Sequence, residues 1–268
     1  MSDQTQTAIG SFLAALAQKE CRAIGKALAN KRNRHSAVHE ARKAIRRLRC
    51  LLALIRDSVG DDTSKIELAL KSQSKRLSAL RDAQVVAVLA EKLAANDDTG
   101  EWTAAARELA ERRDALLASE LAQDPGFAHR IAAIHDVATI LGQLHWKRIA
   151  PNALRRAIKK SRRRVIRAEH ATRQMVSNAN LHRWRRCVRR LRLQLVAIAA
   201  LNRSQGTRVC HVSTHQGESV KALTHLAEQL GRRQDIQVLR SAFKTFSDSS
   251  ILPTLRKRLR IEMRLAKR

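Results

Sequence analysis

Apolar residues recur along most of the chain at spacings of three and four, the pattern that predicts amphipathic helices. Strand-like alternation of apolar and polar residues is not evident, and short polar segments containing Gly or Pro interrupt the helical pattern. We therefore expect an all-α fold. The predicted helices span residues 8–29, 36–57, 64–95 (with a bend near 72–74), 101–122, 127–147 and 179–201, and three more begin at residues 151, 220 and 253.

The clearest break is the segment 123–126, which contains both Pro and Gly and divides the chain into two halves. Pro151 stands where a proline commonly begins a helix. We expect one domain, 1–268, made of two helical repeats. The first repeat covers residues 8–122, a connecting helix covers 127–148, and the second repeat covers 151–268.

One twelve-residue motif occurs twice in nearly the same form. Residues 38–49 read VHEARKAIRRLR, and residues 181–192 read LHRWRRCVRRLR. A shorter match follows each copy, because Asp82-Ala83-Gln84-Val85 resembles Asp235-Ile236-Gln237-Val238. The motif copies are offset by 143 positions and the shorter matches by 153, so about ten extra residues are expected near 202–217. Two ordered matches, separated by a loop insertion, predict a duplicated helical unit.

On a helix that turns about 100° per residue, each motif separates into a cationic face and an apolar face. Like charges four residues apart destabilise a helix, so two such faces favour a polyanion site over a merely solvated basic surface. The first cationic face holds His39, Arg42, Lys43, Arg46 and Arg49, with Arg47 at its margin, opposite Val38, Ala41, Ile45, Leu48, Leu52 and Ile55. The second holds His182, Arg185, Arg186, Arg189, Arg190 and Arg192, opposite Leu181, Trp184, Val188, Leu191 and Leu195.

The charge of the whole chain supports an anionic partner. The 268 residues include 53 Lys and Arg against 24 Asp and Glu, which gives a formal net charge of +29. Such a balance favours nucleic acid, an anionic membrane surface or a phosphate polymer as partner. Aromatic residues make up only 3% and Tyr is absent, which argues against recognition of bases by stacking but leaves contact with a DNA backbone open.

The cysteines and the hydropathy pattern indicate a soluble cytoplasmic protein. Cys21, Cys50, Cys187 and Cys210 are widely spaced and form no C-x-x-C pair, which is typical of reduced cysteines and argues against a zinc site. No apolar segment is long enough to span a bilayer. The apolar run near the N-terminus is too short for a signal or anchor.

Catalytic and metal-binding motifs are missing from the sequence. No P-loop, G-x-S-x-G, H-E-x-x-H or paired-carboxylate pattern occurs, and phosphoryl-transfer enzymes generally need acidic residues to hold Mg²⁺. His35 and His39 have the spacing of a metal pair, but Asn178 replaces His35 in the second copy. Asp82 and Asp235 are interpreted as residues that orient neighbouring cations or cap a turn. We expect no enzymatic activity, no catalytic residue, no metal and no cofactor.

The two motif copies and the trailing LRDAQV and RQDIQV segments resemble the CHAD family, the conserved histidine α-helical domain, over about residues 8–267. This resemblance implies two pseudo-symmetric antiparallel helical bundles, which are duplicated four-helix units, whose basic helices face a central groove or pore. It also implies non-enzymatic binding of inorganic polyphosphate in the cytoplasm, commonly at polyphosphate granules. A triphosphate-tunnel phosphatase domain, which some relatives carry, does not fit, because the Glu-x-Glu-x-Lys signature is missing.

The resemblance carries over residue by residue to the cations and histidines of the two motif copies, and the predicted polyphosphate-binding set adds the cations Arg81, Lys159, Arg162 and Arg163. Two alternatives remain: a sequence-independent DNA or nucleoid-binding protein that uses the basic segments 155–167 and 253–268, and a metal-dependent phosphohydrolase. The predicted set consists of His39, Arg42, Lys43, Arg46, Arg47, Arg49, Arg81, Lys159, Arg162, Arg163, His182, Arg185, Arg186, Arg189, Arg190 and Arg192.

Overall fold

The computed structural model describes residues 3–60, 62–95, 97, 100–206, 210, 219–246 and 250–266. Over these residues the chain forms α-helices and short 3-10 turns without a strand, which confirms the all-α prediction. The helices are α1 (Asp3–Ala29), α2 (Arg34–Val59), α3 (Asp62–Arg76), α4 (Ser78–Ala94), α5 (Glu101–Gln123), α6 (Ala128–Gln143), α7 (Pro151–Gln174), α8 (Asn178–Ser204), α9 (Val220–Ala242) and α10 (Leu252–Leu265).

The two motif helices, α2 and α8, begin in the same way. The side chain of Asn33 accepts a hydrogen bond from the backbone N–H of Ser36 at the start of α2. The side chain of Ser177 accepts one from the backbone N–H of Asn180 at the start of α8. Each cap satisfies an N–H group that lacks a partner inside its helix, which places the start of each motif helix.

The helix predicted for residues 64–95 is two helices, and the bend lies at Leu77 rather than near 72–74. Near this point the hydroxyl of Ser78 donates to the backbone oxygen of Ser74 at 2.9 Å. The guanidinium of Arg42 donates to the same carbonyl. A serine bonded to the carbonyl four residues earlier commonly bends a helix, and the arginine reinforces the bend here.

The connecting segment is shorter than predicted and belongs to the core. Helix α6 occupies 128–143, and the 3-10 turn Trp146–Arg148 follows it. Phe127 adopts the left-handed conformation with φ of 62°, so the helix starts after it. Leu141 is fully buried in the main core, and the carbonyl of Ala138 accepts a hydrogen bond from Gln18 at 2.8 Å. Segment 127–148 is therefore a packed element.

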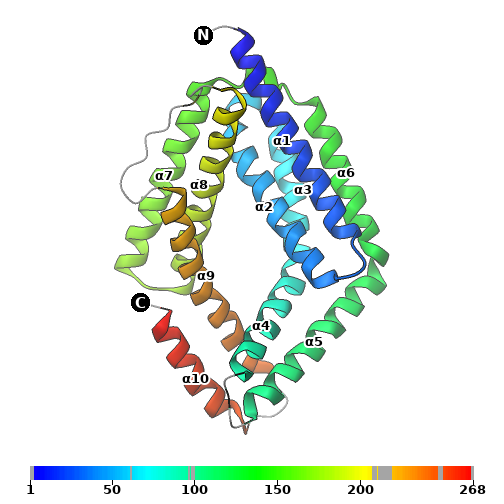
Figure 1. Cartoon of the computed structure of the whole chain (residues 1–268), viewed down its shortest axis with the longest axis vertical. Helices are drawn as coiled ribbons and strands as arrows, with labels where there is room; N and C mark the ends of the chain where they lie inside the picture. The colour runs from blue at the N-terminus through cyan, green and yellow to red at the C-terminus, as the bar shows by residue number, and fades with distance from the viewer. Residues whose placement is uncertain are drawn as a thin grey trace.

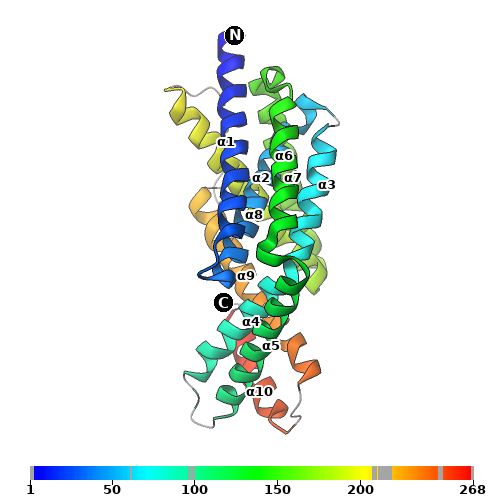
Figure 2. The same ribbon diagram turned by 90° about the vertical axis from the view of Figure 1, so that its right-hand side faces the viewer.

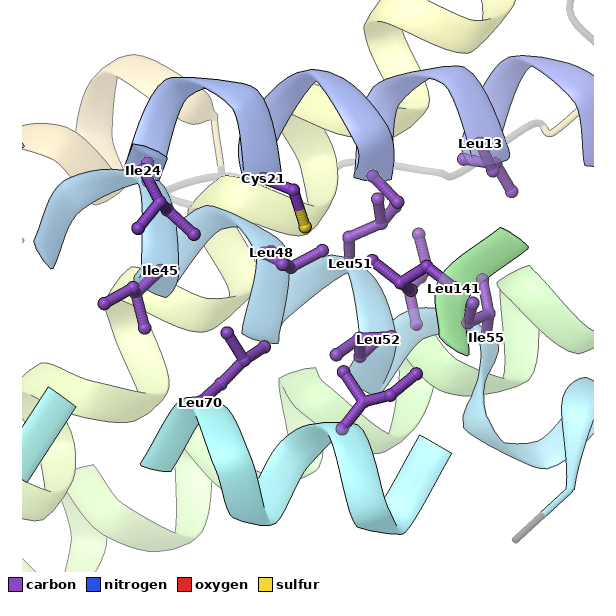
Figure 3. Close-up of a cluster of buried hydrophobic side chains, with 14 of the residues drawn as sticks. Leu13, Cys21, Ile24, Ile45, Leu48, Leu51, Leu52, Ile55, Leu70 and Leu141 are labelled. Atoms are coloured by element: carbon purple, nitrogen blue, oxygen red, sulfur yellow. The ribbon is translucent and has the colours of Figure 1, made fainter. Parts of the chain in front are cut away.

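The main hydrophobic core forms where α1, α2, α3 and α6 converge (Figure 3). The apolar face predicted for the first motif is buried along its whole length, with each of its six residues at most 2% exposed, which confirms that prediction. In the second motif Val188, Leu191 and Leu195 are buried, whereas Leu181 and Trp184 are only partly covered. The apolar side of each motif thus anchors its helix and fixes which side is left for the cations.

A second hydrophobic cluster lies at the lower end of the view in Figure 1, where α4, α5, α9 and α10 meet. Trp102 and Phe243 are each 1% exposed, and their ring centroids are 5.8 Å apart. Phe246 packs edge-on against Phe243 at 5.0 Å. We call this group of aromatic and aliphatic side chains the apex core.

The helices outline a diamond, with α1, α2, α3 and α6 in its upper right part, α7 and α8 in its upper left part, and the apex core at the bottom (Figure 1). Figure 2 shows that α1, α6 and α7 run along the long axis. Helices α2 and α8 also contact each other, because the side-chain amide of Gln194 donates to the backbone oxygen of Cys50 at 3.3 Å.

The two halves are not equal in detail. Helix α10 has 14 residues, whereas α5, which precedes α6 in the first half, has 23. Most of the ten extra residues expected near 202–217 lie outside the described residues. The pseudo-symmetric duplication therefore stays a prediction.

Two further expectations concern membranes and cysteines. Among the described residues, no helix combines the length and apolar character that a membrane crossing requires. The four cysteines are free thiols, and three of them are buried.

Candidate functional site

A cavity of about 1180 Å³ lies between α2, α4, α8, α9 and α10. Its walls bring together the cationic faces of both motif helices, although the two copies are more than a hundred residues apart in sequence. Nine members of the predicted set line this cavity: His39, Arg42, Lys43, Arg46, Arg47, Arg81, Arg185, Arg189 and Arg192.

The other seven members of the predicted set do not line the cavity. Arg49 lies 3.6 Å from the carboxylate of Glu67 on α3, and its pKa is lowered by burial and then by the charge of Arg190. These two arginines therefore share a different flank of the motif helices. The residues outside the cavity are Arg49, Lys159, Arg162, Arg163, His182, Arg186 and Arg190.

Arg42 and Arg185, which occupy matching positions in the two motif copies, are each held by a side chain of another helix. Arg42 of α2 donates to the hydroxyl of Ser78 at 2.9 Å. Arg185 of α8 donates to the side-chain oxygen of Gln234 on α9 at 2.7 Å. Both guanidinium groups are thereby fixed at the cavity wall before any ligand is present, which reduces the entropy lost when an anion binds.

Gly231 gives Arg185 the room that it needs. A Cβ atom at this position would lie 2.6 Å from Nη2 and 3.1 Å from Cζ of Arg185. Glycine inside a helix costs about 1 kcal/mol relative to alanine. Its presence in the middle of α9 is explained by the close approach of the guanidinium to the helix backbone.

The two carboxylates of the repeated Asp-x-Gln-Val segments are engaged with arginine. Arg81 donates to Asp82 at 2.9 Å and to Asp235 at 3.0 Å, and Asp235 also lies 4.0 Å from Arg185. Although burial opposes the charge of Arg81, these hydrogen bonds and carboxylate charges raise its pKa. The interpretation that Asp82 and Asp235 orient neighbouring cations is confirmed.

Arg46 and Arg189 have a different environment. Among the residues that the structure describes, neither side chain has a hydrogen-bond or ion-pair partner. Burial lowers the pKa of Arg46, and the charge of Arg81 lowers it further. Burial, followed by the charges of Arg46 and Arg185, lowers the pKa of Arg189 to about 8. The empty cavity therefore concentrates positive charge that the protein itself does not neutralise.

Several guanidinium groups also leave a donor without an acceptor. The Nε atoms of Arg42, Arg185, Arg189 and Arg192 are buried and find no hydrogen-bond partner in the described part of the chain. A buried donor without an acceptor typically costs about 1–3 kcal/mol. An anion in the cavity would supply the acceptors that these donors lack.

The two motif histidines occupy different positions. His39 lines the cavity, and burial together with the charge of Lys43 lowers its pKa despite the opposing charge of Glu40. His182 lies outside the lining, and its pKa is lowered by burial although a hydrogen bond with Gln234 opposes the shift. Both imidazoles therefore favour the neutral form at pH 7. His35, the other half of the suggested metal pair, instead bonds to Asp114 at 3.0 Å.

Part of the cavity wall was not predicted from the sequence. Lys92 on α4, Arg232 on α9 and Arg258 on α10 add positive charge, and Glu262 lies 3.2 Å from Arg232 and 3.7 Å from Arg258. A signal was available for Arg232, which closely precedes the repeated Asp-x-Gln-Val segment as Arg81 does. Arg258 had no comparable signal, because its helix carries no copy of either motif.

The sequence matches the CHAD domain over residues 9–244. The fold is similar to that of the CHAD domain from the plant Ricinus communis, with 15% identity, a TM-score of 0.65 and coverage of 97% of this chain and 84% of the other. It is also similar to PptA from Streptomyces chartreusis, with 16% identity, a TM-score of 0.66 and coverage of 97% and 96%. No curated protein is a significant match. Because the matched segment covers most of its length, the chain belongs to the CHAD domain family.

Proposed function

We propose that the protein binds inorganic polyphosphate in the cavity between the two motif helices. The observation that carries this proposal is the pair Arg46 and Arg189, which are half-buried cations without a partner in the described residues. Guanidinium groups bind phosphate oxygens with two hydrogen bonds and keep their charge next to an anion. A phosphate chain would relieve the repulsion within the cavity and satisfy its buried donors.

The spacing of the cations suits a polymer better than a single phosphate. His39, Arg42 and Arg46 follow one another along α2, and Arg185, Arg189 and Arg192 do so along α8. Residues on successive helical turns lie about 5.4 Å apart along the axis, so each helix offers several positions to one flexible chain. Each phosphate that is neutralised releases counterions, which makes affinity depend steeply on salt.

We also propose that binding takes place without hydrolysis. Enzymes that transfer phosphoryl groups commonly hold Mg²⁺ with carboxylates beside the phosphates. Asp82 and Asp235 are hydrogen-bonded to Arg81. Their charge is thus directed at a guanidinium group. A protein that holds the polymer without cleaving it would be retained where polyphosphate accumulates, so we extend the proposal to polyphosphate granules in the cytoplasm.

A titration with polyphosphates of defined length at two salt concentrations tests this function. We expect affinity to rise with chain length until the cavity is filled and to fall steeply with salt. Duplex DNA at equal phosphate concentration should not empty the cavity. Incubation with Mg²⁺ or Mn²⁺ should leave the chain length unchanged. Length-independent binding would contradict the polymer site, and phosphate release that depends on His39 would favour the phosphohydrolase.

Replacing Gly231 by Ala should weaken polyphosphate binding without destabilising the fold. The added methyl group would push Arg185 from its place beside α9, while alanine favours the helix by about 1 kcal/mol. We expect affinity to fall about tenfold, the size of one hydrogen bond to a charged group. Gly25→Ala is the matched control, because a Cβ there meets nothing within 4 Å. Equal affinity of the two variants would show that the position of Arg185 does not matter.

Polyphosphate affinity should increase as the pH falls from 7.5 to 5.5. The pKa of His39 is lowered in the empty protein, so its protonation there costs stability as the pH falls through that lowered value. The negative charge of bound phosphates raises the pKa of His39 and favours its protonated, imidazolium form. Binding then takes up a proton, and affinity can rise by at most about tenfold per pH unit.

The control for this pH dependence is a histidine outside the cavity. His39→Asn should flatten the pH profile of affinity, whereas His170→Asn, which changes an exposed residue of α7, should leave it unchanged. Long chains are the appropriate ligand, because their few terminal groups then contribute little titration of their own. A His39→Asn profile as steep as that of the wild type would place the titrating group elsewhere.

A further inference from the structure

Helix α7 carries a dense row of cations on its outer face. Eight of its Lys and Arg side chains are exposed, seven of them between residues 155 and 167, and the opposite face of the helix is buried. None of the seven lines the cavity. Two of them, Lys159 and Arg163, belong to the set that the sequence assigned to polyphosphate. We call this group the α7 ridge, and it consists of Arg155, Arg156, Lys159, Lys160, Arg163, Arg164 and Arg167.

Little negative charge accompanies the ridge. Lys160 lies 3.9 Å from Asp57, and Arg155 bonds to the side chain of Asn152. Glu169 of the same helix is paired with Arg173, which lies beyond the ridge. For the remaining five ridge residues, no carboxylate lies within 4.0 Å in the described ranges. Like charges four residues apart destabilise a helix, so the ridge reduces the stability of α7.

The fold itself does not require these charges. Helix α1 precedes the first motif helix as α7 precedes the second, and it packs against α2 as α7 packs against α8. Over its 27 residues, the exposed cations are Lys19, Arg22 and Lys26. Helix α1 shows that a helix in this position can pack against its motif helix with few exposed cations. The additional positive charge of α7 is therefore not needed for packing.

The shape of the ridge suits a double helix. Residues 155 and 167 are separated by about 18 Å along the helix axis. The major groove of B-form DNA is about 12 Å wide and admits an α-helix. The major groove of double-stranded RNA is too narrow for this. The ridge presents only Lys and Arg, without an aromatic side chain on which unpaired bases could stack.

A membrane surface fits α7 less well. Helices that lie on a bilayer insert their apolar face among the lipid chains. The apolar face of α7, including Leu154, Ala157 and Ile158, is already buried against the rest of the protein. Ile166 is exposed on the outer face, but one side chain does not form an insertable surface.

We propose that the α7 ridge is a second polyanion site, separate from the cavity, which binds the phosphate backbone of duplex DNA without sequence preference. It does not rest on the function proposed for the cavity. A protein with both sites would hold a phosphate polymer and DNA at the same time.

The test uses the full chain and a labelled duplex of about 20 base pairs, measured over a range of salt concentrations. The ridge variant carries Arg156→Gln, Arg163→Gln and Arg164→Gln, and the matched control carries Lys19→Gln, Arg22→Gln and Lys26→Gln on α1. We expect the ridge variant to lose at least tenfold in DNA affinity and about three units of salt slope. The α1 control should lose much less, and neither variant should unfold at a lower temperature than the wild type.

Two further measurements distinguish this site from the cavity. Arg46→Gln with Arg189→Gln should bind DNA as the wild type does, and one equivalent of polyphosphate should not release bound DNA from the wild type. The proposal is overturned if the α1 control loses as much DNA affinity as the ridge variant, or if one equivalent of polyphosphate displaces DNA. Tighter binding of single strands or of anionic lipid vesicles than of duplex DNA would also overturn it.

Discussion

Replacing Arg46 and Arg189 together by Gln should lower polyphosphate affinity by at least about 100-fold and yet make the empty protein more stable. Each arginine is expected to form a charge-assisted hydrogen bond with the ligand, and such bonds contribute about 1.5–3 kcal/mol. The opposite effect on stability arises because the charges of these two side chains are unfavourable in the empty cavity.

The sign of the stability change follows from the pKa of Arg189, which burial lowers to about 8 in the folded protein, far below the ordinary value of a guanidinium group. At neutral pH the side chain is protonated in both folded and unfolded states, and the folded state bears the full cost of burying the charge. That cost is relieved only as the pH rises above about 8 toward the much higher pKa of the unfolded chain. Glutamine is uncharged, so the substitution removes the cost of burying this charge already at neutral pH.

Thermal unfolding and polyphosphate titration of the same variant check both effects. A gain of about 1 kcal/mol should raise Tm by about 2–4 °C in a protein of this size. Lys19→Gln with Lys26→Gln on α1 removes the same charge from exposed positions and should change neither property appreciably. A variant that loses affinity and also unfolds at a lower temperature would show that the two arginines support the fold.

Replacing Trp102 by Ala should destabilise the protein by about 3–5 kcal/mol, the usual cost of deleting a large buried aromatic side chain. Trp102 is 1% exposed in the apex core, which joins α4 and α5 to α9 and α10. Helices α4 and α9 carry Arg81, Gly231, Gln234 and Asp235 of the cavity. Loss of the apex core should therefore also weaken polyphosphate binding, although Trp102 does not line the cavity.

Chemical denaturation measures the loss of stability, and amide hydrogen exchange locates it. We expect faster exchange in α4 and α9 than in α1 and α2, whose core is separate. Trp102→Phe is the control: the buried indole nitrogen has no hydrogen-bond partner in the described residues, so its removal leaves no polar group unsatisfied. A loss below about 1 kcal/mol for the Ala variant would mean that the apex core is not needed to join these helices.

Much of the fold was predictable because it depends on local patterns. The apolar face of the first motif identified α2 and the side that it buries, from Val38 to Ile55. The bend at Leu77 was less accessible, because the Arg42 contact that reinforces it comes from another helix. The apolar and polar pattern of one helix carries no information about a contact made by a side chain of another helix.

The candidate site was predictable only in part, for a geometrical reason. A helical wheel placed Arg46 and Arg49 on one face, but α2 and α8 pack against each other, and their crossing separates the two residues. Arg46 faces the cavity, whereas Arg49 pairs with Glu67 on another flank. The angle at which two helices cross depends on the whole core. The sequence of either helix therefore predicted its charge correctly without predicting which charges meet.

The carboxylate of Asp235 has a consequence for the choice of ligand. It is tethered beside Arg81 and Arg185 and so acts as a permanent internal competitor for their charge. A lone orthophosphate must outcompete this tethered group with a single interaction. A long chain also has to displace Asp235, but only once. Its neighbouring phosphate units are then held close to the other cations, so they bind at a high effective concentration. On the proposed function, discrimination against small anions would thus arise from competition within the protein, and no part of the fold would need to measure the length of the ligand.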